Sequence, residues 1–86
     1  MPEISRFYGI VIHIYFGDHQ PPHFHAHYGG DKAVIAIESL HVLEGSLPKR
    51  AMNLIFDWAG LHQRELLEAF ERASALQSPG IIPPLD

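Results

Sequence analysis

Histidines are the side chains of this sequence with the clearest capacity for chemistry. Seven are present and cysteine is absent, so a bound metal would need imidazole and carboxylate ligands rather than thiolates. Zinc, nickel and copper are the ions that imidazole suits best. Five of the histidines fall within fifteen residues of one another: His13, His19, His23, His25 and His27.

Spacing limits which of these histidines can share one ion. Residues two apart on a strand lie about 6.5 to 7 Å apart, close enough for two imidazoles to meet one ion. His23 and His27 are about twice as far apart, so His25 must pair with one or the other. Spacing leaves two pairs open, His23 with His25 or His25 with His27, each joined by His13 from the neighbouring strand or by Asp18 and His19 from the loop. The set that we carry forward is His19, His23 and His25, with Asp18, His13 or His27 as a further ligand.

Two other interpretations of the histidines stay open. They can be ordinary polar residues on the exposed face of a sheet, stacking on Tyr15 or bonding to each other. Catalysis would need more than a metal, namely a general base beside an open coordination position. Asp18 and Glu38 are the carboxylates that we consider for that base.

The elements that must position these residues begin with two strands. Apolar residues alternate over residues 10–16 and again over residues 23–28. Glycines at 29–30 predict a type I′ hairpin turn, because both of its central residues need positive φ. The turn pairs Ala26 with Ala33 and Phe24 with Ile35. The predicted core face carries Ile10, Ile12, Ile14, Phe16, Phe24, Ala26 and Tyr28. The opposite face carries His13, Tyr15, His23, His25 and His27.

The second half of the chain predicts one helix and a tail. A weaker strand near residues 40–43 is followed by Pro48, which suits a first helical position. Residues 48–76 are then rich in helix formers. Their predicted core stripe comprises Ala51, Ile55, Trp58, His62, Ala69, Ala73 and Leu76. Gly60 would bend or break this helix. The tail at 77–86 is extended, and its apolar residues either dock on the sheet or join a second protomer in a homo-oligomer.

Length and charge narrow the class of protein. The chain has 86 residues, which predicts one domain over 1–86 with a sheet at about 4–44. We expect an α+β fold, in which an antiparallel β-meander of three to four strands packs on one long C-terminal helix. The net charge of −4 argues against nucleic acid as the partner. No membrane span or secretory signal is predicted, so we expect a cytoplasmic protein.

A second group of residues is a candidate partner-binding surface. Lys49 and Arg50 fall in the first turn of the predicted helix, where the helix dipole disfavours cations. With Arg6 and Tyr8 they predict a contact with an acidic partner, or with an RNA phosphate, which the net charge disfavours. A simple ion pair with Glu44 would explain the two helix cations equally well.

Several motifs together resemble a known family. They are Ile4-Ser5-Arg6-Phe7-Tyr8-Gly9, Asp18-His19, Pro21-Pro22-His23-Phe24-His25-Ala26, Leu43-Glu44-Gly45, Leu47-Pro48, Trp58 and Ile82-Pro83-Pro84-Leu85. The chain thereby resembles the small bacterial domains of unknown function numbered DUF4160. The resemblance implies a β-meander with a long helix, and a neighbouring gene in a toxin-antitoxin-like pair. By this resemblance His19, His23 and His25 belong to the family motif, whereas His13, His27 and His41 look particular to this chain.

Two functions follow as hypotheses. The first is a small protein-interaction module, one component of a two-gene regulatory or toxin-antitoxin-like pair, whose partner is the product of the neighbouring gene. The alternative is a metal-dependent hydrolase or ribonuclease that uses the histidine-rich hairpin, with zinc or another divalent transition metal as its cofactor.

Overall fold

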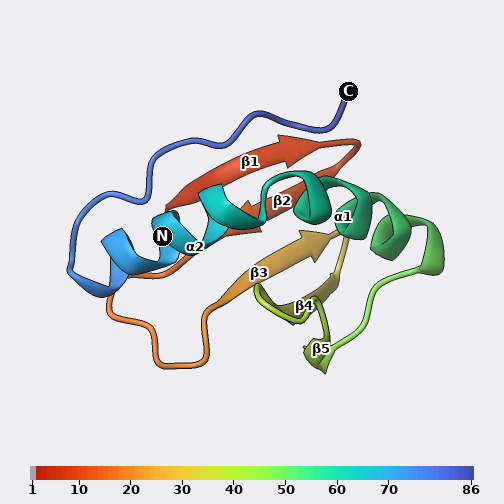
Figure 1. Cartoon of the computed structure of the whole chain (residues 1–86). Coiled ribbons are helices and arrows are strands. Elements are labelled where there is room, and N and C mark those ends of the chain that lie inside the picture. Colours follow the sequence, from red (N-terminus) through yellow and green to blue (C-terminus); the bar gives the residue numbers. More distant parts are fainter. Residues whose placement is uncertain (1) are drawn as a thin grey trace.

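Alternating apolar side chains form a sheet whose strands follow one another in chain order. The computed structural model describes residues 2–86, and Figure 1 shows two helices lying across one face of this sheet. The strands are β1 (Glu3–Phe7), β2 (Ile10–His13), β3 (His23–Tyr28), β4 (Asp31–Ala36) and β5 (Val42–Gly45). Each pairs antiparallel with the next, in the order β1-β2-β3-β4-β5. The fold is therefore α+β, with five strands instead of the predicted three to four.

The β3–β4 hairpin has the predicted register. Phe24 pairs with Ile35 and Ala26 with Ala33, and all four side chains are buried under the helices. The predicted turn type is wrong. Of the two glycines in the turn, Gly29 has a positive φ of 59° and Gly30 does not. A type II′ turn needs positive φ at its first central residue alone, whereas type I′ needs it at both.

The strands differ from prediction at several points. The weaker strand expected near residues 40–43 is β5, at Val42–Gly45. The expected strand at 10–16 ends at His13, and Phe16 is exposed instead of buried. The chain leaves the sheet there, and the N–H of Gly17 donates to the carbonyl of Ala73 at the end of the helical layer. Tyr28, also expected in the core, is exposed at the hairpin end. Strand β1 was missed because a bulge after Glu3 buries two successive residues and breaks the alternation.

The predicted long helix is two helices. Helix α1 spans Lys49–Leu61 and α2 spans Gln63–Ser74, and they are separated at His62, whose φ of −126° is not helical. The break is therefore two residues after Gly60. Most of the predicted stripe is buried: Ala51, Ile55, Trp58, Ala69 and Ala73. Leu76 is exposed, because α2 ends before it. No helix within residues 2–86 is both long and apolar enough to cross a bilayer.

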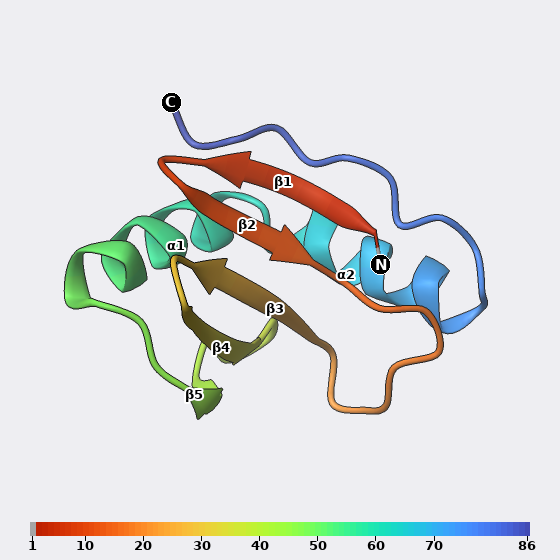
Figure 2. The ribbon, with the colours of Figure 1, turned by 180° about the vertical axis from the view of Figure 1, so that it is seen from behind.

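The C-terminal tail docks on its own chain. Figure 2 shows it running beside β1 along the edge of the sheet. The N–H of Ile82 donates to the carbonyl of Ile4 at 2.8 Å, and the indole N–H of Trp58 donates to the carbonyl of Pro83 at 2.8 Å. Ile82 is buried. The tail thus covers the β1 edge, whereas all four residues of β5, at the other edge, are exposed.

Candidate metal centre

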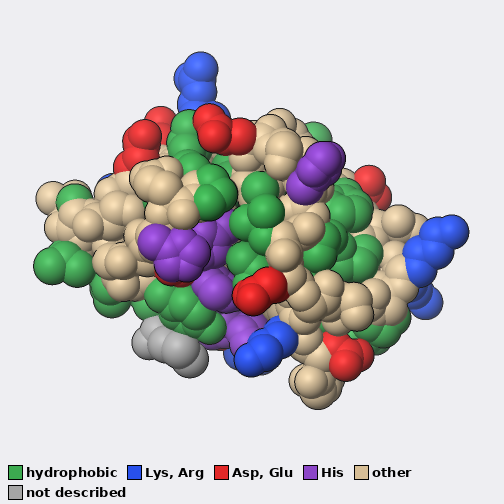
Figure 3. All heavy atoms as spheres, turned by 90° about the horizontal axis from the view of Figure 1, so that it is seen from below, with side chains coloured by type: hydrophobic (Ala, Val, Ile, Leu, Met, Phe, Trp, Pro, Cys, Tyr) green, Lys and Arg blue, Asp and Glu red, His purple; other side chains and the backbone are tan. Residues whose placement is uncertain are grey.

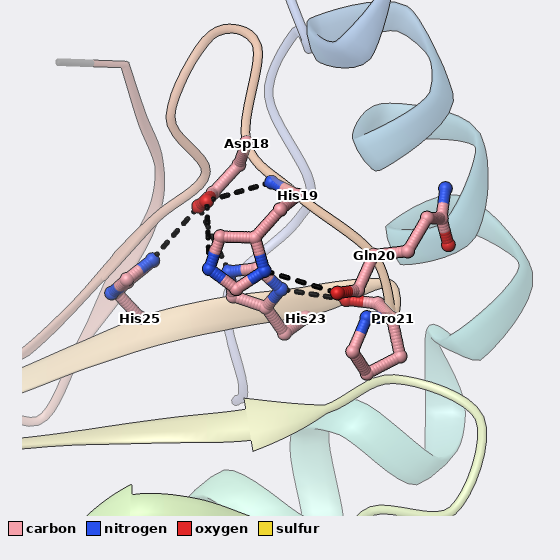
Figure 4. Close-up of polar contacts among 6 residues, drawn as sticks. All are labelled: Asp18, His19, Gln20, Pro21, His23 and His25. Carbon is pink, nitrogen blue, oxygen red and sulfur yellow. Dashed lines mark hydrogen bonds and ion pairs between the residues drawn. The ribbon is translucent and has the colours of Figure 1, made fainter.

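Three side chains converge beside the start of β3. His23 and His25 lie on the same strand, and Asp18 reaches them from the loop that joins β2 to β3 (Figure 4). Asp18 Oδ2 lies 2.8 Å from Nε2 of His23 and 3.1 Å from Nε2 of His25. One ligand atom from each residue lies within 4.8 Å of the other two. This metal triad, Asp18–His23–His25, contains two of the three predicted principal ligands.

The orientation of the His23 ring is fixed by packing on one side and by a hydrogen bond at Nδ1. Its side chain is 3% exposed and packs against Phe70 of α2, with ring centroids 5.5 Å apart. Its Nδ1 lies 2.7 Å from the carbonyl oxygen of Pro21, which can only accept, so Nδ1 carries the proton. In the neutral ring the lone pair of Nε2 then points at Asp18. Histidine ligands of metals are commonly oriented by this kind of hydrogen bond.

The protonation states of the triad suit a cation. Burial would raise the pKa of Asp18, but hydrogen bonds from His25 and from the backbone N–H of His19 outweigh it and lower that pKa. Burial lowers the pKa of His25, against the hydrogen bond to Asp18 that raises it. At neutral pH the carboxyl group is therefore ionised and His25 is neutral, as metal ligands must be.

The donor set and the space around it fit a small transition-metal ion. Ligand bonds of 2.0 to 2.1 Å in a tetrahedral site place ligand atoms about 3.3 Å apart. The two distances from Asp18 Oδ2 to the histidine nitrogens, 2.8 and 3.1 Å, are slightly shorter than this. Two histidines and one carboxylate leave a further position free. A hollow of about 220 Å³ adjoins the triad, and Val34, Leu43 and Glu44 also line it. A ligand could reach the ion from there.

Comparison with known families adds an identification. The family model of the domain of unknown function DUF4160 matches residues 9–71, which include the whole triad. The chain belongs to this family. No curated protein and no solved structure is similar enough to count as a match. The family description names no reaction, so the function of this DUF4160 domain has to be argued from its geometry.

The other predicted ligands lie outside the triad. His19 is 84% exposed, and its ring lies beside that of His23 while its Nδ1 is 3.0 Å from the carbonyl of Gln20. His13 and His27 face each other edge to face, with ring centroids 5.0 Å apart. Figure 3 shows several histidine side chains gathered in one patch on the face seen from below. Sharing a face therefore does not place all of them at one point.

Neither of the two predicted general bases is a separate carboxylate beside the triad. Glu38 is exposed and lines a separate hollow with Gln63 and Arg64, while Asp18 is itself a triad member. Glu44 is the carboxylate that lines the hollow next to the triad. No residue pattern predicts this position, because a bulge between Val34 and Ile35 sets the register of β5 against β4.

The predicted partner-binding residues are divided in space. Tyr8 is 57% exposed and shares a hollow of about 270 Å³ with Tyr28, Arg50 and Leu54. Arg6 instead forms an exposed ion pair with Glu3 at 2.8 Å. Within residues 2–86, neither helix cation pairs with Glu44. Tyr8 and Arg50 are thus the two predicted residues that the fold brings together.

Proposed function

We propose that this domain binds one divalent transition-metal ion, zinc being the best fit, through Asp18, His23 and His25. The observation that supports it most is the orientation of His23. Its Nδ1 is occupied by the Pro21 carbonyl, so its Nε2 lone pair faces the Asp18 carboxylate at 2.8 Å. In the neutral ring nothing joins these two electron-rich atoms, and a cation between them would satisfy both.

A zinc titration of untagged protein tests this proposal. Calorimetry with elemental analysis should find one equivalent of tightly bound zinc in the parent protein. Asp18→Asn preserves the size of the side chain but removes its charge, and should weaken binding by roughly 100-fold or more. The matched control is His27→Ala, which removes an imidazole from the same strand and face and should leave the affinity unchanged. Equal affinities of parent and Asp18→Asn would refute the site.

The open position of the metal supports hydrolysis as the reaction. A bound ion lowers the pKa of a coordinated water, and a nearby carboxylate can take the proton from it. Glu44 lines the hollow beside the triad, which supports it as the residue for that step. Chromogenic phosphodiesters and carboxylate esters would serve as substrates for the zinc-loaded protein. Turnover by the parent and its loss in Glu44→Gln, with zinc still bound, is the expected result; unchanged turnover in that variant would remove Glu44 from the role.

A second candidate function is a protein-interaction module within a two-gene, toxin-antitoxin-like pair. Its support is the hollow between Tyr8 and Tyr28, with Arg50 on its wall, because exposed tyrosine and arginine are typical of binding hot spots. Co-expression with the neighbouring gene product should give a complex that Tyr8→Ser with Arg50→Ala disrupts. Lys49→Ala is the matched control, since it removes an adjacent cation outside the hollow. No co-purification would contradict this function.

The homo-oligomer through the tail also stays a prediction. The described tail packs on β1 of its own chain, so an oligomer would require its apolar residues to exchange between protomers or its exposed Ile81 to make a contact. Light scattering of the parent and of Ile81→Ser would test it. A mass that stays monomeric at all concentrations would rule it out.

A further inference from the structure

A second hollow continues from the metal triad along the open face of the sheet. It measures about 450 Å³, and its main lining side chains are Tyr15, His25, His27, Lys32, Val34 and Glu44. Three of these residues, His25, Val34 and Glu44, also line the smaller hollow that contains the triad. The two hollows therefore share a wall, and together they form a groove with the triad at one end.

The strand register sets the direction of this groove. His25 pairs with Val34, and Val34 pairs with Glu44, so these three side chains form one row across β3, β4 and β5. His27 pairs with Lys32 in a parallel row two residues along. The Cα atoms of His25 and Lys32 are then diagonal neighbours, about 8 Å apart. Lys32 thus stands at the end of the groove opposite the triad.

The charges along the groove are positive at both ends and negative between them, which limits the kind of ligand that it can bind. The triad end would carry a metal cation, and Lys32 supplies a second cation that forms no ion pair within residues 2–86. Glu44 stands on the shared wall between them and would repel an anion placed in the middle. Tyr15 packs against His25, with ring centroids 4.2 Å apart and ring planes tilted by 45°, and gives the middle of the groove an aromatic surface.

We propose that this groove binds a small, elongated ligand with an anionic group at one end. A metal-coordinating group would lie at the triad, an apolar or planar middle against Tyr15 and Val34, and a carboxylate or phosphate against the Lys32 ammonium group. The proposal rests on the metal site proposed above and adds to it the substrate class of the groove.

The experiment uses zinc-loaded protein and synthetic probes of one length. The probes are adipic acid monohydroxamate, its methyl ester and its phosphonate analogue, because a hydroxamate coordinates zinc while the far end is varied. Calorimetry measures their affinities for the parent, for Lys32→Gln and for Lys49→Gln, a control that removes the same charge elsewhere. Zinc content is measured for each protein in parallel.

The parent should bind the carboxylate or the phosphonate about tenfold more tightly than the neutral ester, since a charge-assisted hydrogen bond is gained. Lys32→Gln should lose this preference and keep its zinc, while Lys49→Gln should retain both. The tighter of the two anions identifies the end group. Equal affinity for acid and ester in the zinc-bound parent, or a preference that survives Lys32→Gln, would overturn the ligand class alone. A parent that binds no zinc would overturn the metal site as well.

Discussion

Two pairs of histidines lie on the same face of the sheet but are built differently. His23 and His25 both turn Nε2 toward Asp18, at 2.8 and 3.1 Å. His13 and His27 pack edge to face at 5.0 Å, and Nε2 of His27 is buried without a hydrogen-bond partner among residues 2–86. One pair surrounds a carboxylate, whereas the other has none.

The difference between the pairs comes from the loop and not from the strands. The strands bring the imidazoles of both pairs together. His13 pairs directly with His25, and His27 is therefore the diagonal neighbour of His13. Only the loop between β2 and β3 adds an anion and a carbonyl that orients a ring. Proximity of histidines is therefore insufficient for a metal centre, and the local backbone that supplies the remaining ligand decides which pair becomes one.

The largest expected contrast between the pairs is in stability. His23 is buried, packs on Phe70 and donates from Nδ1 to the Pro21 carbonyl, so His23→Ala creates a cavity and leaves that carbonyl without its partner. We expect a loss of about 2 to 4 kcal/mol in the free energy of unfolding. His27→Ala should cost less than about 1 kcal/mol, because its ring is only partly buried. Urea unfolding in the presence of a chelator measures both variants without any metal contribution.

His23→Gln separates the two causes of that loss. It retains much of the volume and one polar contact, so its stability should fall between those of the parent and His23→Ala. If His23→Ala and His27→Ala unfold at the same urea concentration, the two pairs are structurally equivalent and the expected contrast between them is wrong.

The parts of the fold that depend on local pattern could be predicted from the sequence. The β3–β4 register followed from strict alternation and a two-residue turn, and it placed His23, His25 and His27 with one parity. The β1 strand and the β5 register did not follow, because a bulge in each shifts the alternation. A break in the helix was predicted at Gly60, and it lies two residues further on, at His62.

The candidate site was also predictable only in part, for the residues that lie on a strand. His23 and His25 were identified by spacing, and Asp18 was included only as a further ligand. Its position as the centre of the triad depends on the path of the loop from His13 to His23, which no residue pattern encodes. His19 is adjacent in sequence yet turns outward. Loop conformation is set by tertiary contacts, such as the bond between Gly17 and Ala73, and these are invisible in a single sequence.

A medium-sized effect concerns pH, and it should involve both pairs. Burial lowers the pKa of His25 and also that of His13, where repulsion from His27 adds to it. A folded-state pKa below the unfolded value of about 6.5 contributes stability that is present above that value and lost as pH falls through the folded pKa. The urea concentration at the unfolding midpoint should therefore decrease as the pH is lowered from 7.5 to 5.5. The Asp18 contribution is lost only in more acidic solution, because its lowered pKa lies below about 3.9.

Single variants assign this acid response to its two sources. His25→Gln and His13→Gln should each make the urea midpoint less sensitive to pH over the same interval, and the double variant should be flatter than either. A pH response that is unchanged in the double variant would mean that neither buried imidazole causes it, and that the two pairs do not share burial as their common feature.

The smallest expected effect is on the His13–His27 pair, the one without a carboxylate in contact. Glu3 faces His13 across β1 and β2, and its negative charge raises the pKa of His13 against the stronger effect of burial. Glu3→Gln should therefore lower the pKa of His13 further, while the urea midpoint at pH 7.5 hardly changes, because Glu3 otherwise makes only an exposed pair with Arg6. NMR titration of the ring protons measures the shift, and His25, two strands away from Glu3, is the internal reference. An equal shift at His25 would show that the charge acts on the whole face, and the two pairs would then be electrostatically one cluster.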